Sequence, residues 1–448
     1  MKTHLNFITA FVFSIETKML LTFCVSPIPP PTPTARPVEL EVVTEAPPTA
    51  TPEPIATPEP TATAEPTDIP LIETGLPIAP YAVGSTPVIT KLHMIDRGVG
   101  WAIAIDMIGH DEHILYTTNG ALSWQDITPA EPQSTYLTSH KDVIGYFSGP
   151  RDAWIVYDWD TSRDSFNRST VWITHNAGKS WTPSSRINSS GLKYFMPFAI
   201  NFVDKTDGWL LVNTGSNGID ETFVLYGTQD GGANWTRLTD SSSNLLPPGA
   251  LKTGLLFSSR LVGWLSIDDP GYSPNLPYLF QTVDGGLHWK LYSLPAPTGL
   301  PTFFAANPCL SIVSAPALSS SVDVLVDCEK VSTSADKFKL YRTADQGNTW
   351  TIHDLPSPYG DLSFLDSNYG WLLGRGSDPD AYPRQIYQTQ DGGKTWTLIK
   401  SVNWSGTLDF VDNQNGWVAS IRSPIYDAVV HTTNGGAGWS ILPVTITK

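Results

Sequence analysis

The sequence predicts an all-β protein, a seven-bladed β-propeller preceded by a disordered Pro/Thr-rich linker. Three observations predict this fold. An octet of residues, Thr-x-Asp/Asn-x-Gly-x-x-Trp, occurs seven times between residues 117 and 439, with Ala121 replacing the Gly of the first copy. A Gly-Trp pair precedes the octet in most copies. The region 86–448 then contains about 52 residues per repeat, which suits a blade of four short strands.

Residues 1–24 resemble an export signal. Lys2 gives a positive start, and the mostly apolar stretch Leu5 to Ile15 is too short to span a bilayer. The run Leu21-Thr22-Phe23-Cys24 resembles a bacterial lipobox, with Phe23 where that motif has a small residue. The resemblance implies an exported protein, either a cell-surface lipoprotein lipidated on Cys24 or a secreted protein. A mis-assigned start or an ordinary cleaved signal are the alternatives.

Residues 25–85 form the linker. The stretch contains two Ala-Thr-Pro-Glu-Pro runs, and its eight acidic residues face a single basic one, Arg36. Proline fixes φ and removes hydrogen-bond donors, and the acidic side chains keep the segment solvated. We therefore expect an extended spacer between the export signal and the folded part. The more specific alternative is that this segment is a Pro-rich ligand that binds another domain.

Each repeat indicates four antiparallel strands. In the third repeat they are expected at Phe198–Phe202, Trp209–Val212, Thr222–Tyr226 and Trp235–Leu238, with turn residues at every junction. The Gly-Trp pair begins the second strand, and the octet connects the third strand to the fourth. The fifth repeat lacks the Gly-Trp pair and has Val322-Asp323 instead.

The third octet position has a structural explanation. An Asp or Asn side chain there accepts backbone N–H groups and closes the turn, and the following Gly permits a positive φ. We expect structural rather than catalytic or metal-binding roles for these seven residues, which are Asn119, Asn176, Asp230, Asp284, Asp345, Asp391 and Asn434.

These octets resemble the Asp boxes of the sialidase-like, BNR-repeat propellers. Their alternation with Asp-x-x-x-Gly-Trp motifs is similar to the photosystem II stability/assembly factor family, over residues 86–448. That resemblance implies a tethered or lumenal scaffold that holds an assembly intermediate of a membrane complex. Members that bind photosystem proteins use a basic, Arg-lined surface, whereas this chain is acidic and has no evident Arg cluster.

Composition excludes several function classes. The chain has 43 acidic and 27 basic residues, a net charge of −16, which argues against nucleic acid and against a basic patch for anionic lipid. Membrane contact is expected only through a lipid anchor. We predict no metal, because His110-Asp111-Glu112-His113 lies in a short loop before a strand and not on a helix. We also predict no cofactor, since no phosphate-cradling Gly-rich loop opens a helix.

The two remaining cysteines indicate a disulfide. Pairing Ser314 with Asp323 in a hairpin places Cys309 opposite Cys328, within reach of a bridge. The alternative is two free buried thiols. A disulfide would require an oxidising compartment, which agrees with export.

The binding surface is expected on the face built by the strand two–three loops and the blade-to-blade links, because these differ in every repeat. Aromatic and Arg side chains are frequent interface anchors. We predict binding roles for Trp159, Tyr272, Tyr382, Arg384 and Tyr426. The alternative is that these loops merely tolerate sequence drift.

Two function classes therefore stand. The favoured one is an extracytoplasmic, non-catalytic binding or assembly propeller whose partner is a protein, such as a membrane complex or a cell-surface component. The alternative is a glycan-binding protein or a glycoside hydrolase. The Arg-Ile-Pro motif of sialidases is missing, and the pairs Asp111-Glu112 and Asp268-Asp269 are more simply solvated loop acids. Clustering of Arg375, Arg384 and Arg422 around one pocket would favour the enzyme.

Overall fold

A computed structural model of the chain gives a seven-bladed β-propeller. The chain divides into two units, Met1–Pro70 and Leu71–Lys448. The structure describes residues in the second unit only, namely 78–105, 111–130, 142–158, 170–192, 194–216, 221–241, 246, 251–268, 278–304, 309–314, 321–328, 338–357, 361–374, 383–420 and 428–447.

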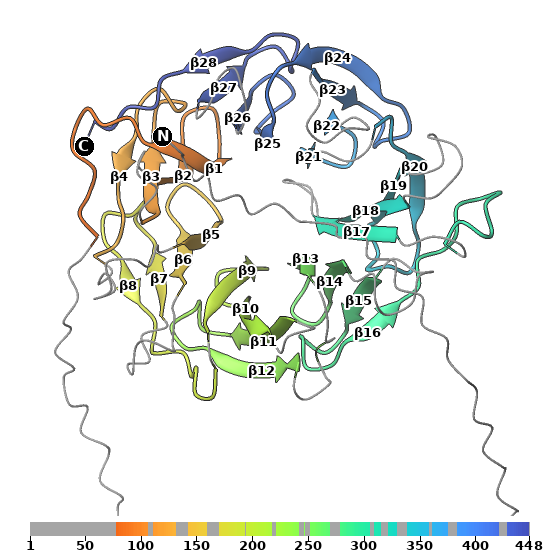
Figure 1. The fold of residues 1–448 in the computed structure, drawn as a ribbon, viewed down its shortest axis with the longest axis horizontal. Helices are drawn as coiled ribbons and strands as arrows, with labels where there is room; N and C mark the ends of the chain where they lie inside the picture. The colour runs from red at the N-terminus through yellow and green to blue at the C-terminus, as the bar shows by residue number, and fades with distance from the viewer. Residues whose placement is uncertain are drawn as a thin grey trace, which may run out of the picture. The chain divides into compact units, whose positions relative to one another are not determined.

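Seven four-stranded antiparallel sheets are arranged in a ring, each built from consecutive strands (Figure 1). The innermost strands are β1 (Val88–Met94), β5 (Val143–Phe147), β9 (Met196–Phe202), β13 (Leu251–Phe257), β17 (Cys309–Ser314), β21 (Asp361–Phe364) and β25 (Gly406–Phe410). The second strands are β2 (Gly100–Ile105), β6 (Ala153–Tyr157), β10 (Gly208–Ser216), β14 (Gly263–Asp268), β18 (Val322–Cys328), β22 (Gly370–Gly374) and β26 (Gly416–Ser420).

The third strands are β3 (His113–Thr117), β7 (Val171–Thr174), β11 (Glu221–Thr228), β15 (Tyr278–Thr282), β19 (Phe338–Thr343), β23 (Arg384–Thr389) and β27 (Val429–Thr432). The outermost strands are β4 (Gln125–Asp126), β8 (Thr182–Pro183), β12 (Thr236–Asp240), β16 (Lys290–Tyr292), β20 (Thr351–Asp354), β24 (Thr397–Val402) and β28 (Ser440–Leu442). We number the blades 1 to 7 in chain order. The predicted all-β propeller is confirmed, and no helix long and apolar enough to span a membrane occurs among the described residues.

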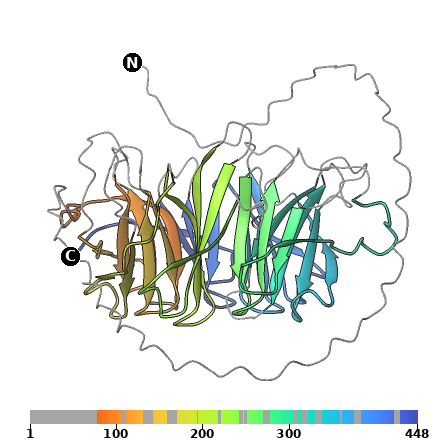
Figure 2. The same ribbon diagram turned by 90° about the horizontal axis from the view of Figure 1, so that it is seen from below.

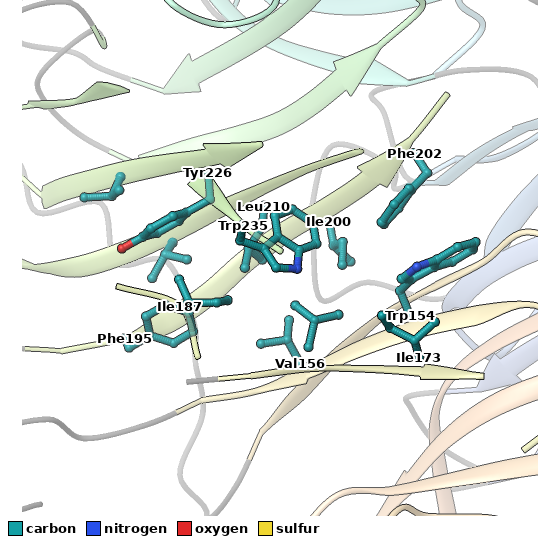
Figure 3. Close-up of a cluster of buried hydrophobic side chains, with 13 residues drawn as sticks. Trp154, Val156, Ile173, Ile187, Phe195, Ile200, Phe202, Leu210, Tyr226 and Trp235 are labelled. Atoms are coloured by element: carbon teal, nitrogen blue, oxygen red, sulfur yellow. The ribbon is translucent and has the colours of Figure 1, made fainter. Parts of the chain in front are cut away.

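The hydrophobic core consists of seven clusters, one at each interface between neighbouring blades. In the cluster between blades 2 and 3, Trp154 and Val156 of β6 pack against Ile200 and Leu210 of the next blade (Figure 3). Each blade therefore buries its apolar faces only against its neighbours. Since one blade alone would leave these faces in water, the repeats are stable only as a ring.

The Gly-Trp tryptophans join one blade to the next. In blade 3, the indole of Trp209 stacks on Phe257 of blade 4 with ring centroids 3.7 Å apart, and its Nε1 donates to the carbonyl of Gly285 at 2.9 Å. Gly285 belongs to the octet of blade 4. The same donation to an octet glycine of the next blade joins Trp154 to Gly231, Trp371 to Gly435 and Trp417 to Gly120.

The ring is closed by the two ends of the folded unit. Trp124 of blade 1 donates its backbone N–H to Thr445 and accepts one from Thr447, in a parallel bridge centred on Ile446. On the other side of this segment, Ile446 donates to Ser85 at 3.0 Å. The C-terminal residues thus lie between the outer edge of blade 1 and the segment that precedes β1.

Residues 78–85, which the sequence analysis assigned to the linker, pack on blade 1. Ile78 is buried in the cluster between blades 1 and 2. The ring of Tyr81 stacks on His113, with centroids 3.9 Å apart, and its backbone N–H donates to the carboxylate of Asp126. Folded structure therefore begins before residue 86.

Candidate functional site

The two faces of the propeller differ in how regular their connections are; Figure 2 shows the blades from the side. The connection from the third to the fourth strand has seven residues in every blade, and that from the first to the second has five in all but blade 5. These connections share one face, which we call the constant face. On the opposite, variable face, the connections from the second to the third strand run from 4 residues in blade 3 to 13 in blade 2.

The octets hold the constant face rigid. In blade 3, Thr228 donates its hydroxyl to Oδ1 of Asp230 at 2.8 Å, and the backbone N–H of Asn234 donates to the same oxygen at 2.9 Å. The backbone N–H of Gly232 donates to the Thr228 hydroxyl at 2.9 Å. The bond from the Thr hydroxyl to the third octet residue recurs in all seven copies, on Asn119, Asn176, Asp230, Asp284, Asp345, Asp391 and Asn434.

The octet carboxylates are ionised by this arrangement. For Asp391, hydrogen bonds from the side chain and backbone of Thr395 lower the pKa to about 2. For Asp230, burial opposes ionisation, but the bonds from Asn234 and Thr228 outweigh it and lower the pKa. Because their oxygens are used within the turn, these groups are structural and are not arranged as catalytic acids.

Polar side chains on the innermost strands tie neighbouring blades together. Asn201 of β9 accepts the backbone N–H of Phe257 in β13 at 2.9 Å. Asp409 of β25 accepts that of Met94 in β1, and Asp361 of β21 accepts that of Leu408 in β25. These side chains satisfy backbone donors at sheet edges that would otherwise lack partners.

Two titratable side chains of the innermost strands, Asp361 and His93, have shifted pKa values. Burial raises the pKa of Asp361 to about 7, against the hydrogen bond from Leu408, and the charge of Asp409 adds to the rise. His93 lies 3.7 Å from Asp409; burial disfavours its charged form, but the hydrogen bond and charge of Asp409 prevail and raise its pKa. A carboxyl group with a raised pKa beside a second carboxyl group is one requirement of a glycoside hydrolase.

An apolar pair is exposed beside the variable face. Met196 and Phe198 of β9 each retain 37% of their surface exposed. They lie at the start of an innermost strand, at the end that the variable face occupies. The sequence analysis counted Phe198 only as a strand residue, because alternation alone does not distinguish the ring interior from a blade interface.

The structure describes only one of the five predicted binding residues, Arg384. Trp159, Tyr272, Tyr382 and Tyr426 lie outside the described residues, as do Arg375 and Arg422. Arg384, which was expected in a loop, is the first residue of β23 and is 4% exposed. It therefore does not project from the surface as an interface anchor would.

Among the described residues, no group of three or more His, Cys, Asp or Glu side chains is placed to hold a metal ion. His113 of the His110–His113 run instead contacts Asp126, with Nδ1 and Oδ2 2.8 Å apart, in a nearly buried pair. Glu112 accepts the backbone N–H of Val143 at 2.6 Å and links blade 1 to blade 2. Both side chains thus have structural contacts.

The folded unit belongs to the structural class of seven-bladed β-propellers. No family model matches the chain, and no curated protein matches it in sequence. Several solved structures match its fold. One described as YCF48 bound to D1 peptide is 16% identical, with 80% of this chain and 98% of that chain covered and a TM-score of 0.47.

Two further structures are similar at the same level. YCF48 from Cyanidioschyzon merolae is 15% identical, with 79% of this chain and 99% of that chain covered and a TM-score of 0.45. The GH74 xyloglucanase from Xanthomonas campestris is 12% identical, with 82% and 56% covered and a TM-score of 0.46. At such identities the likeness concerns the fold, and function has to be argued from this chain's own residues.

Proposed function

We propose that this chain is an exported, non-catalytic binding or assembly propeller that engages a protein partner through its variable face. The observation that carries the proposal is the contrast between the faces: seven-residue turns throughout one, connections of 4 to 13 residues on the other. A rigid frame that presents dissimilar loops is the usual construction of a recognition surface. The exposed Met196 and Phe198 add apolar area beside it.

The proposal includes location outside the cytoplasm. Cys309 and Cys328 are directly opposite each other in β17 and β18 and form a disulfide, a bond that persists in oxidising compartments. Export through residues 1–24, with or without lipidation of Cys24, would place the propeller there. Mass spectrometry of the mature N-terminus distinguishes a lipidated Cys24 from a secreted chain.

Partner capture tests the binding proposal. The tagged full chain is incubated with detergent-solubilised envelope, and bound proteins are identified by mass spectrometry. Substitution of Trp159, Tyr272 and Tyr382 by Ala is expected to abolish capture of one specific protein. The control Leu398→Ser plus Ile441→Ser, at exposed positions of outermost strands, should retain it. Equal capture by both variants would contradict a role for the variable face.

A glycoside hydrolase is the second candidate, favoured by the raised pKa of Asp361 beside Asp409. Hydrolysis of a panel of sialosides and plant and bacterial polysaccharides tests it. If activity appears and Asp361→Asn removes it while the folded protein persists, the enzyme replaces the scaffold. No hydrolysis across the panel would support the reading of both acids as structural.

A further inference from the structure

The constant face carries an apolar patch on blade 4, opposite to the face proposed for the main partner. Leu261, Val283 and Leu287 retain 59%, 63% and 44% of their surface exposed. Leu261 lies in the turn between β13 and β14, and the other two lie in the octet between β15 and β16. Exposed aliphatic side chains that cluster on turns, where polar residues are normal, indicate a contact surface.

Comparison among the blades shows that this patch is peculiar to blade 4. In the five other blades that have five-residue turns between the first two strands, the residues equivalent to Leu261 are Gly98, Arg151, Thr206, Asn368 and Gln414. The residues equivalent to Val283 are Thr118, His175, Gln229, Ala344, Gln390 and Thr433. At the position of Leu287 the others are Leu122, Lys179, Ala233, Asn348, Lys394 and Ala437. Turn geometry therefore does not require the aliphatic residues of blade 4.

The patch borders a cavity. Between blades 3 and 4, an open depression of about 720 Å³ is lined by the apolar side chains of Leu238, Leu261 and Leu287 and by the carboxylates of Asp207, Asp230 and Asp284. A second depression of about 790 Å³ lies between blades 2 and 3 and shares Asp230. We call the two together the octet groove. Because the two depressions lie at successive blade interfaces and share Asp230, a ligand that fills both has to be extended, as a peptide is.

The charges beside the patch favour a basic ligand. Arg260 is the single Lys or Arg lining the first depression, and its Nε lies 3.0 Å from Asp207. Asp230 and Asp284 retain their charge, because hydrogen bonds within their turns overcome burial and lower both pKa values. His288 contacts Asp284 from an exposed position, 2.6 Å away. In the second depression, which Arg151 and Lys205 line together with Asp152 and Asp230, Lys205 lies 3.1 Å from Asp152. The excess of acidic side chains is therefore in the first depression.

From this combination we propose that the octet groove docks an extended segment of a second protein, one that carries an aliphatic side chain beside a Lys or Arg. The aliphatic side chain would cover Leu261 and Leu287, and the cation would lie near Asp230 and Asp284. A second copy of this chain is a poor occupant, because its net charge of −16 opposes approach to the acidic first depression.

The test uses the full chain and a defined probe. A fluorescein-labelled peptide, Gly-Leu-Lys-Leu-Lys-Leu-Gly, is titrated and followed by anisotropy. Two matched peptides replace both Lys by Glu or all Leu by Ser. The proposal expects binding of the first peptide at least about tenfold tighter than either matched peptide, because each supplies only one of the two contacts. Equal affinity for the three peptides, or no binding of the first, would overturn it.

Variants of the chain then locate the site. Leu261→Ser with Leu287→Ser should weaken binding about tenfold, whereas Leu398→Ser, at a 49% exposed leucine on β24, should not. Asp230→Asn with Asp284→Asn removes two charges and keeps the turns, since three octets have Asn there naturally. It should weaken binding similarly, and the matched pair Asp345→Asn with Asp391→Asn, in octets outside the groove, should not.

Equal weakening by the control pair would show nonspecific attraction to an acidic protein and would overturn the proposal. Sedimentation of the chain without peptide tests whether a second copy of this chain occupies the groove instead. Dimerisation that Leu261→Ser with Leu287→Ser abolishes would assign the patch to a second copy and would likewise contradict the proposal. Since the variants lie on the constant face, their effects are separable from those of Trp159, Tyr272 and Tyr382.

Discussion

Arg342 and Asp323 form a buried ion pair in blade 5, with Nε and Oδ1 2.8 Å apart, at the site where other blades place the Gly-Trp tryptophan. They are directly opposite in β19 and β18. The guanidinium lies 3.8 Å from the ring centre of Phe364 and donates to the carbonyl of Gly392, both in blade 6. Arg342 thus makes the two contacts to the next blade that Trp209 makes to Phe257 and Gly285.

The first prediction concerns this replacement. Arg342→Gln alone leaves Asp323 buried without its counter-charge and should lower the free energy of unfolding by about 3–5 kcal/mol. Asp323→Trp with Arg342→Gln copies blade 4, where Trp264 is opposite Gln281, and should recover most of that loss. Guanidinium denaturation of both single variants and the double variant measures the coupling. Losses that simply add would contradict the shared role of the two residues.

The second prediction concerns the octet backbone. Gln346 has φ of 61° at a position where five octets have Gly, and Gly392 has φ of 78°. Gln346→Gly should therefore stabilise the protein by about 1 kcal/mol. Gly392→Ala should cost about 1–3 kcal/mol, because its Cβ would lie 2.8 Å from the carbonyl oxygen of Ser367.

Thermal and denaturant unfolding measure both changes. Gly149→Ala serves as the control, since a Cβ there meets nothing within 4 Å and its φ is not positive. Its effect should stay within about 0.5 kcal/mol. An equal loss in Gly149→Ala and Gly392→Ala would show that the octet turn is not the cause.

Much of the fold could be predicted because its information is local. Each octet contains its own acceptor, hydroxyl and left-handed residues, so seven copies predict seven turns and hence seven blades. The pairing of Cys309 with Cys328 likewise follows from a single hairpin register, which the structure shows. Local patterns also assigned the constant and variable faces.

The rest depends on contacts between distant residues. Arg342 is recognisable as a tryptophan substitute only once Phe364 and Gly392 of the next blade lie beside it. Tyr81 looked like part of the linker because its partners, His113 and Asp126, are far along the chain. The apolar patch beside the octet groove was missed because single exposed leucines are ordinary in a sequence; comparing Leu261 and Leu287 with the equivalent residues of other repeats would have found it.

The third prediction concerns the disulfide. Cys309 and Cys328 close a loop with a sequence separation of 19 in the blade that lacks the Gly-Trp pair. Cys309→Ala with Cys328→Ala should lower the free energy of unfolding by about 3 kcal/mol, mainly because the unfolded chain regains entropy. Denaturation of this variant and of the unmodified chain, each with and without dithiothreitol, measures the loss. Reductant should reproduce it only in the unmodified chain, and an undiminished stability would contradict the prediction.

The last prediction is that stability declines from pH 4.5 to pH 7.5. Burial raises the pKa of Asp361 to about 7 and, against the pull of Arg342, that of Asp323 to about 6. Both values exceed the ordinary value near 4, so between these limits the folded chain binds more protons than the unfolded chain. The free energy of unfolding therefore falls as pH rises through this window.

Below pH 4 the sign reverses. Hydrogen bonds from Thr395 hold the pKa of Asp391 at about 2. The ionised carboxylate therefore stabilises the folded chain above its ordinary pKa, and this stability is lost as pH falls toward 2. Urea denaturation from pH 3 to pH 8 should thus show a maximum near pH 4–5. Asp361→Asn keeps an acceptor for Leu408 and removes the charge; it should flatten the decline and add about 1–3 kcal/mol at pH 7.5. Asp391→Asn should lower stability above pH 5 by a constant amount and flatten the slope only on the acid side, because this carboxyl group gains its protons below about pH 5 in both the folded and the unfolded chain. Stability that rises toward pH 7.5 in the unmodified chain would show that the fold does not raise the pKa values of Asp361 and Asp323.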